Sequence, residues 1–536
     1  MKLSVEGLQD VQAFVDAGVM LPGFDVAKSQ SRGVQCPRWV HIGPGNIFRV
    51  FLARIASQMI DAGFPWPVTA VVPRDPRELD VQLSEHDLMS LGVTLNPDGS
   101  RGLQAIAGIS EGLATAREED FARLVEIFRD PGMTLVSFTI TEKGYVIRGS
   151  DGALSQCVVE ELEQDPRVHH ANTMLLVTGL LFHRFEAGGA PITLMSCDNF
   201  SRNGDKLRES VLAVAASWEE QGSVPAGFIT WLSDRKMVGF PISVIDKITP
   251  RPSEMIATEL ADLGFIDMEV TAPFGAPLAG FVNTEPTEYL VVEDAFVGAR
   301  PPFEDFGVVV TDRQTCDDFE RMKVTTCLNP LHTALAVSGC LLRFPTIDAE
   351  MRDPSLKRMV ERLGWDEGMP VVVDPGVVNP ADFLREVLEV RLPNPYLPDD
   401  PARIAMDTSQ KLSIRFGETL KAYIERGLDL ETLEVMPLVF ALWFRYLMGV
   451  ADDGEPFTPS PDPLLEELQG RLRSISLGQA SSVEQVHEVL EPVLSNPNIF
   501  GMDLYKTPLG MKVEVLFKDL IAGPGSVRAT LDEEMK

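Results

Sequence analysis

The chain is 536 residues long, and hydrophobic residues make up 45% of it, which is enough for substantial cores in two or three domains. Its 79 acidic residues outnumber 47 basic ones, and the formal net charge is −32. Nucleic acid and anionic membrane surfaces both require a positively charged contact surface, so this charge argues against either as a partner. A small anionic substrate is not excluded, because one local basic pocket is enough to bind it.

The six cysteines are scattered without close pairs, and no CxxC or HExxH motif occurs. We therefore predict neither a disulfide framework nor a structural zinc, and no motif supports a catalytic metal. The N-terminal segment MKLSVEGLQDVQAF lacks the apolar core of a signal peptide. No apolar run long enough to span a membrane occurs, so we expect a soluble cytoplasmic protein.

The first strong pattern is a strand, a glycine-containing turn and a helix. Residues 39–42 predict a short strand, and the apolar segment 50–62 has helical spacing. Glycines in such a turn let the backbone approach a pyrophosphate, which binds at the helix N-terminus. Only two of the usual three glycines occur, so an ordinary strand-to-helix turn is the alternative. The candidate cofactor-binding residues at this turn are Gly43, Gly45, Asn46 and Ile47.

A second predicted strand, 68–72, ends near the place where a dinucleotide-binding unit carries its ribose-binding acid. Asp75 lies just beyond this strand and favours NAD as the cofactor. The neighbouring Arg74 could instead accommodate the 2′-phosphate of NADP. We favour NAD and keep NADP as the alternative, and a solvated loop would explain both residues without any cofactor.

Further strands and helices alternate along the first half. Two strands are predicted around the turn 96–99, then a helix over 114–129 and a strand over 135–140. Ligands bind at the carboxyl ends of strands in α/β sheets, so Thr141 and Lys143 are candidate cofactor-binding residues. A turn with a solvated lysine is the alternative. The remaining predicted elements of this half are a helix over 172–186, a strand over 191–195, a helix over 206–218, and strands over 239–248 and 289–292.

From about residue 315 onward, apolar residues recur at helical spacing and strand patterns are few. The predicted helices span 333–343, 355–363, 380–390, 410–425, 429–449, 462–474 and 481–494. We therefore predict an α/β fold with an N-terminal dinucleotide-binding domain, 1–295, and a mainly helical domain, 296–536. The segment after Gly525 is charged, and we expect it to be frayed.

A lysine, an asparagine and a histidine lie close together in Met322–Leu335, which reads MKVTTCLNPLHTAL. Lys323 could transfer a proton if burial lowered its pKa toward neutrality. Asn329 offers an amide donor to a developing oxyanion, and His332 would share its face of a helix. Taken alone, the segment also fits a capped helix start with a surface lysine.

Six segments together resemble the long-chain, zinc-independent polyol dehydrogenases. That family groups mannitol 2-dehydrogenase with fructuronate reductase, tagaturonate reductase and mannitol-1-phosphate dehydrogenase. The segments follow the family's order over more than half of the chain, and RLPNP at 391–395 looks familiar in the helical half. They are GPGNIFR at 43–49, TITEKGY at 139–145, MSCDNFSRNG at 195–204, SVIDKITP at 243–250, the EP…VVED segment at 285–294 and KVTTCLNPLHTALA at 323–336.

The resemblance implies a Rossmann-type domain followed by a largely helical domain, with NAD(H) or NADP(H) as cofactor. By resemblance, Lys323 matches the family's general base, and Asn199 and Asn329 match the asparagines that hold the carbonyl oxygen. His332 matches a histidine that binds a substrate hydroxyl, and Asp246 an aspartate near the lysine. The candidate substrate-binding residues are Arg391 and Lys411.

Two departures mark the chain as a divergent member. Lys323 and Asn329 are six residues apart, whereas the family usually has five. One extra residue in a regular helix turns a side chain by about 100°, so we expect a bulge or a non-helical turn between them. Pro330 also replaces a glycine of the usual pattern, which removes an N–H group.

The leading hypothesis is an NAD(P)-dependent oxidoreductase that interconverts a secondary alcohol and a ketone on an acyclic sugar acid or polyol. Candidate pairs are fructuronate and mannonate, tagaturonate and altronate, or mannitol and fructose, and we favour the uronates. A carboxylate substrate needs a cationic group, which Arg391, Lys411 or Arg49 could provide. The alternative is a catalytically altered relative that binds a dinucleotide as a sensor or scaffold. The sequence leaves open whether the protein is a monomer or a dimer.

Overall fold

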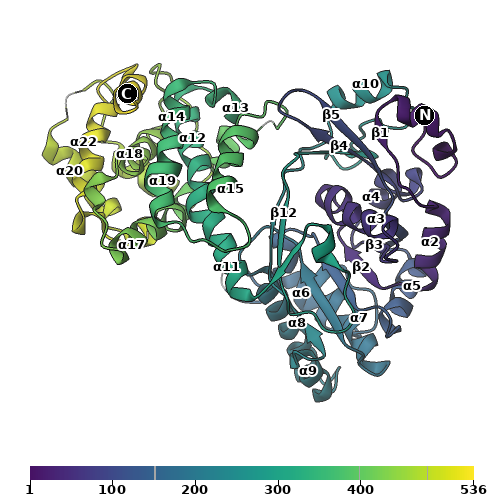
Figure 1. Ribbon diagram of the computed structural model, residues 1–536. Coiled ribbons are helices and arrows are strands. Elements are labelled where there is room, and N and C mark those ends of the chain that lie inside the picture. Colours follow the sequence, from purple (N-terminus) through teal and green to yellow (C-terminus); the bar gives the residue numbers. More distant parts are fainter. Residues whose placement is uncertain (150–151, 398, 480) are drawn as a thin grey trace. The chain divides into compact units, whose positions relative to one another are not determined.

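The computed structural model describes residues 1–149, 152–397, 399–479 and 481–536. The chain divides into two compact units, Met1–Cys316 and Asp317–Lys536 (Figure 1). The sequence pattern predicted an earlier boundary, at residue 295, because no strong strand pattern follows it. In the structure β13 (Val309–Thr311) pairs in parallel with β12 (Tyr289–Glu293), and this pairing keeps the intervening chain in the first unit.

A six-stranded parallel sheet forms the centre of the first unit (Figure 1). Numbered along the chain, its strands stand in the order 3-2-1-4-5-6, which is the order of the Rossmann fold. The order reverses between β2 and β7, and folds of this kind bind their ligands at the carboxyl ends of those two strands. In spatial order the strands are β6 (Ile109–Ala114), β3 (Val68–Val72), β2 (Trp39–Ile42), β7 (Leu135–Phe138), β8 (Ile192–Ser196) and β9 (Val238–Gly239).

Alternating side chains of the central strands pack into two cores. Trp39 belongs to a core that includes α3 (Ala53–Asp61), whereas its neighbour Val40 belongs to a second core. Because both faces of the sheet are buried, the strands appear in the sequence as continuous apolar runs. The helices of the second core are α5 (Glu118–Arg129), α6 (Gln156–Leu162), α7 (Thr173–Glu186), α8 (Asn203–Glu220) and α9 (Ala226–Ser233).

Two smaller sheets complete the first unit. The predicted hairpin around 96–99 is confirmed, since β4 (Ser90–Leu95) and β5 (Arg101–Ile106) pair antiparallel across it. They lie in a four-stranded sheet of order β1-β5-β4-β11, in which β1 is Val19–Met20 and β11 is Phe281–Thr284. The third sheet joins β10 (Ser243–Asp246), antiparallel, to β12.

The second unit is built from helices around α18 (Val435–Leu447), every residue of which is buried. The expectation of a frayed tail is wrong: α23 (Ser526–Glu534) buries Val527 and Leu531 completely, so its apolar positions anchor it. No helix in the described part of the chain combines the length and apolarity needed to cross a membrane. The other main helices are α12 (Asn329–Leu342), α14 (Pro354–Arg362), α15 (Pro380–Glu386), α17 (Glu418–Glu425), α19 (Leu465–Leu472), α20 (Val483–Leu494) and α22 (Leu509–Leu520).

Several turns of the second unit are π-helical, a wider form in which each hydrogen bond spans five residues. In η6 (Lys323–Cys327) the N–H of Leu328 donates to the carbonyl of Lys323 at 3.1 Å. The bulge expected between Lys323 and Asn329 is therefore confirmed. Two further π-turns are η9 (Val387–Arg391) and η11 (Ser413–Gly417). Such turns occur often at functional sites.

Candidate active site

The turn after β2 has a backbone geometry that requires glycine and leaves room for a ligand. Gly43 has a φ of +87°, and a Cβ atom there would lie 2.5 Å from the carbonyl oxygen of Thr139. A Cβ atom at Gly45 would meet only one atom, the Gly43 oxygen at 3.9 Å. Helical structure begins at residue 46, so an open glycine backbone precedes a helix N-terminus. These residues fit the pyrophosphate of a dinucleotide.

This turn is held by a hydrogen-bonded network that no sequence motif indicated. His41 stacks on Phe48, with ring centroids 3.8 Å apart. Its Nδ1 forms a 2.7 Å hydrogen bond with Ser137 Oγ, and its Nε2 lies 3.0 Å from Thr139 Oγ1. The Thr139 hydroxyl in turn donates to the Gly43 carbonyl at 2.7 Å. Burial lowers the pKa of His41 to about 3, so this ring is a neutral link between β2 and β7.

A second network holds the loop that carries Thr141 and Lys143, both of them exposed. Thr141 has a φ of +63°, a strained value for a β-branched residue. Its N–H and that of Ile140 donate to the Asp198 carboxylate at 2.8 and 3.0 Å, and the Tyr145 hydroxyl donates at 2.6 Å. Asp198 therefore ties the end of β8 to the end of β7. Two sequence signals pointed to a role in orienting a neighbour: Asp198 follows a predicted strand, and it directly precedes Asn199, which is exposed.

Asp75 is held in place by local contacts. Its carboxylate accepts the N–H of Arg77 at 3.0 Å and so caps α4 (Pro76–Gln82). The Arg77 side chain forms an ion pair with it at 2.6 Å and lowers the pKa of Asp75. The neighbouring Arg74 is exposed. Both residues considered for the cofactor's ribose thus stand just beyond the end of β3.

Two of the family-like segments are joined around Asp246, the last residue of β10, which is buried. The Ile248 N–H donates to the Glu285 carboxylate at 2.6 Å. Lys247 Nζ donates to the Glu285 carbonyl at 3.0 Å and forms an ion pair with Glu288 at 3.0 Å. These contacts join SVIDKITP to the EP…VVED segment and fix the strand end that carries Asp246.

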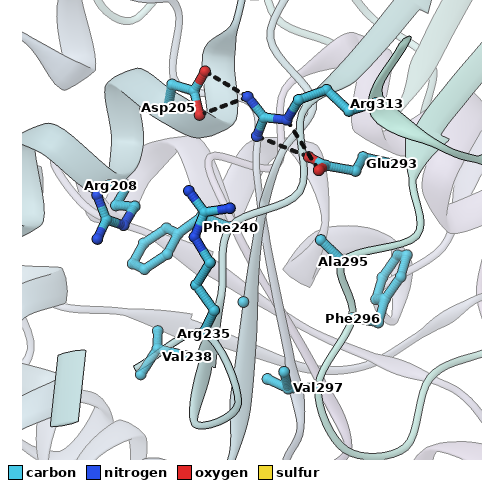
Figure 2. Close-up of a pocket in the computed structure, with 11 residues that line it drawn as sticks. Asp205, Arg208, Arg235, Val238, Phe240, Glu293, Ala295, Phe296, Val297 and Arg313 are labelled. Carbon is cyan, nitrogen blue, oxygen red and sulfur yellow. Dashed lines mark hydrogen bonds and ion pairs between the residues drawn. The ribbon is translucent and has the colours of Figure 1, made fainter. Parts of the chain in front are cut away.

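Arg313 begins α11 (Arg313–Met322), the helix that leads along the chain to Lys323. Figure 2 shows its guanidinium between the carboxylates of Asp205 and Glu293, at 2.8 and 3.0 Å. A cavity of about 120 Å³ lies beside this group, and Arg208 and Arg235 line it (Figure 2). The double ion pair anchors the start of α11 to α8 and to the end of β12.

In the second unit, Lys323 is only 3% exposed and opens the π-turn η6. Asn329 is the first residue of α12, and His332 follows one turn later, so the two share a face of that helix. Pro330 stands in the first turn of α12, where N–H groups have no partner within the helix. The proline that departs from the family pattern is thus compatible with the helix start.

His332 lies among charged side chains that other segments of the second unit supply. Burial is the main cause that lowers its pKa to about 4, and Arg391, Arg415 and Arg403 lower it further. Asp399 acts in the opposite direction. His332 is therefore a neutral imidazole at neutral pH, able to donate one hydrogen bond and accept another.

The predicted cationic residues differ in their surroundings. Arg391 is buried at the end of η9 near His332, whereas Lys411 donates to the carbonyls of Ile404 and Met406. Arg49 is fully buried in the first unit, where it donates to the Ala279 carbonyl at 2.9 Å and to Asn46. Arg49 is thus hydrogen-bonded within the first unit.

The sequence-predicted residues therefore fall into two groups. The first unit carries those proposed for the cofactor, with Asn199 and Asp246, and the second carries Lys323, Asn329, His332, Arg391 and Lys411. The described part of the chain holds no group of three or more histidine, cysteine, aspartate or glutamate side chains placed to bind a metal ion. Arg415 joins the second group without having been predicted, because nothing in its sequence context, SIRFG, marks it.

Comparison with known domain families supplies the identification. The Mannitol dehydrogenase Rossmann domain matches residues 37–305, and the Mannitol dehydrogenase C-terminal domain matches residues 315–512. The chain therefore belongs to the mannitol dehydrogenase family. The resemblance drawn from the six segments is confirmed, and so is the predicted fold class.

Individual relatives agree with this assignment. The D-mannonate oxidoreductase of Thermotoga maritima is 46% identical over 99% of both chains. The mannitol 2-dehydrogenase of Neosartorya fischeri is 29% identical over 88% of this chain and 89% of its own. Among solved structures, a ternary complex of Pseudomonas fluorescens mannitol 2-dehydrogenase with NAD and D-mannitol has a TM-score of 0.70. It is 26% identical over 99% of both chains.

Proposed function

We propose that the protein is an NAD-dependent oxidoreductase that interconverts a secondary alcohol and a ketone on an acyclic sugar acid of the fructuronate and mannonate type. The observation that carries the proposal is the π-turn η6, which begins with the buried Lys323 and leads directly into the helix of Asn329 and His332. A relative that is 46% identical is a D-mannonate oxidoreductase, and this supports the substrate class. The relative solved with NAD and D-mannitol supports the cofactor.

On the cofactor side, the pyrophosphate would be held by the backbone of Gly43, Gly45, Asn46 and Ile47. The space that a side chain at Gly45 would fill is open, so the pyrophosphate can approach the backbone there. Asp75 would accept hydrogen bonds from the ribose hydroxyls, and Thr141 and Lys143 would line the other side. The bound dinucleotide supplies the hydride acceptor or donor. Asp198 would act through Thr141, whose strained backbone it holds with a hydrogen bond of 2.8 Å.

On the substrate side, Lys323 acts as the general base. In the oxidation it removes the proton of the reacting hydroxyl as the hydride leaves the same carbon, and in the reduction it returns that proton. The amides of Asn199 and Asn329 donate to the oxygen on which negative charge develops. His332, as a neutral imidazole, binds another hydroxyl, and Arg391 and Lys411 contact the rest of the sugar chain. Asp246 influences the proton transfer of Lys323. This chemistry requires no zinc.

The alternative, a dinucleotide-binding sensor or scaffold, was supported by the six-residue spacing between Lys323 and Asn329. A π-turn completes one revolution with one residue more than an α-turn, so it absorbs the extra residue. The spacing therefore no longer favours a catalytically altered protein.

The test measures oxidation of NADH and NADPH with fructuronate, tagaturonate and fructose. We expect turnover with NADH and a uronate, and a loss of about 1000-fold or more in Lys323→Ala with unchanged NADH binding. Lys518→Ala, which removes an exposed lysine of the same unit, serves as the matched control. Full activity in Lys323→Ala would contradict the base assignment. NADH binding without turnover of any ketose would favour the sensor.

A further inference from the structure

Arg415 is a half-buried cation that forms no ion pair with a carboxylate among the described residues. Its Nη1 donates to Thr333 Oγ1 at 2.6 Å and to the Asn329 carbonyl at 3.4 Å, and both acceptors are neutral. Among the described residues, no carboxylate forms an ion pair with it, and its Nε and Nη2 groups donate to no protein acceptor. Burial alone lowers the pKa of Arg415 to about 10, with no acidic group to oppose the shift.

Arg49 is also buried without an ion pair, but both of its terminal nitrogens donate to protein acceptors, whereas only Nη1 of Arg415 does so among the described residues. Arg313 lies between two carboxylates, and Arg403 pairs with Asp399. Removing a cation from water without an anion beside it is costly, and the cost is offset when an anionic ligand arrives. A guanidinium edge with two free donors matches the two oxygens of a carboxylate.

The position of Arg415 connects it to the proposed substrate site. Its two acceptors, Asn329 and Thr333, belong to the first turns of α12. His332 lies on the same turns, and the charge of Arg415 is among those that lower its pKa. Arg415 therefore stands beside the two residues proposed to hold oxygens of the substrate. The nearby Lys411 is occupied by the Ile404 and Met406 carbonyls.

We propose that the Nε and Nη2 edge of Arg415 binds the carboxylate of an acyclic sugar acid, and that this contact selects sugar acids over neutral polyols. The inference rests on the proposed function, because it assigns a specificity-determining residue to the same site. Arg415 takes no part in proton or hydride transfer.

The kinetic test compares fructuronate with fructose, a neutral ketose, in Arg415→Met and Arg415→Lys. We expect Arg415→Met to lower kcat/KM for fructuronate about 100-fold, mainly through KM, and to change the value for fructose less than about threefold. The kcat/KM of Arg415→Lys for fructuronate should lie between those of wild type and Arg415→Met. An ammonium group keeps the positive charge but cannot donate two parallel hydrogen bonds to a carboxylate. Arg358→Met, at an exposed arginine of α14, is the matched control.

An equal loss of kcat/KM for both ketoses would show a structural role of Arg415 and overturn the proposal. No loss for either ketose would also overturn it, because the ratio of the two kcat/KM values would then be unchanged. A binding measurement tests the carboxylate contact independently of the proposed catalytic activity. Calorimetry measures the affinity of wild type and Arg415→Met for mannonate and for mannitol, in the presence of NAD. A preference for mannonate that disappears in Arg415→Met supports the carboxylate contact even if no ketose is turned over. Wild type that binds mannonate no better than mannitol overturns it.

Discussion

The glycine turn of the first unit and the start of α12 in the second unit are two kinds of candidate binding site. At Gly45 the backbone itself faces open space, and the buried groups that hold the turn are neutral His41 and hydroxyl groups. At α12 the groups are side chains, and their charges come from segments distant in the chain, such as Arg391 and Arg415. A backbone site depends on the absence of side chains, whereas a side-chain site depends on helix geometry and on long-range packing.

The largest effect should come from distorting the glycine turn. Gly43→Ala places a methyl group 2.5 Å from the Thr139 carbonyl at a φ of +87°. We expect it to lower the free energy of unfolding of the first unit by about 3 kcal/mol and to abolish NADH binding. Urea unfolding and NADH fluorescence measure the two effects. Gly63→Ala is the control, because its φ is +88° but a Cβ atom meets nothing within 4 Å. Equal behaviour of the two variants would argue against close approach as the reason for Gly43.

The π-turn provides a test of the side-chain site. Deletion of Val324 restores a five-residue spacing and lets η6 (Lys323–Cys327) close as α-helical turns, so we expect kcat/KM within about tenfold of wild type. Insertion of an alanine after Val324 adds a residue that one π-turn cannot absorb. It should rotate Asn329 by about 100° relative to Lys323 and reduce kcat/KM about 100-fold. The reverse ranking of these two variants would show that the wide turn itself is required.

His332 should make the second unit sensitive to acid. Its folded-state pKa of about 4 lies below the ordinary value of 6.5. Its stabilising contribution is therefore present above pH 6.5 and is lost as the pH falls toward 4. We expect the free energy of unfolding to decrease in both proteins when the pH is lowered from 7.5 to 5. The decrease in His332→Gln should be about 1 kcal/mol smaller than in wild type, a value that allows for solvent screening. Urea unfolding at both pH values measures this, and the exposed His487→Gln provides the comparison. Parallel losses in all three proteins would contradict the assignment.

Glu350 should show the opposite pH dependence, with an effect of similar size. It is fully buried beside Gly339, its carboxyl oxygens have no hydrogen-bond partner among the described residues, and burial raises its pKa well above 4.5. The stabilising contribution of the neutral acid is complete below pH 4.5 and is lost as the pH rises toward the folded-state pKa. Glu350→Gln should equal wild type at pH 4 and exceed it by about 1 kcal/mol at pH 8. A variant that is equally destabilised at both pH values would contradict this.

Local patterns account for what was predicted well. The strand over 68–72 and the hairpin around 96–99 appear as predicted, because apolar runs and turn residues act within a few positions. The strand β6 (Ile109–Ala114) was not predicted, and its last residue was placed at the start of a helix, since a short apolar segment has no decisive period. Likewise, α23 (Ser526–Glu534) was missed because two buried apolar residues anchor an otherwise charged segment.

By itself, the sequence determined the Rossmann-type half and the glycine turn, and it marked the lysine, asparagine and histidine of the helical half as candidates, because these depend on residue type and short-range order. Only the tertiary structure decided how the extra residue before Asn329 is accommodated, because a π-turn and an α-turn can be built from the same residues. It also decided that Arg415 stands beside His332 without an acidic partner among the described residues. Burial and the lack of a counter-charge arise from segments far apart in the chain, and no local pattern encodes them.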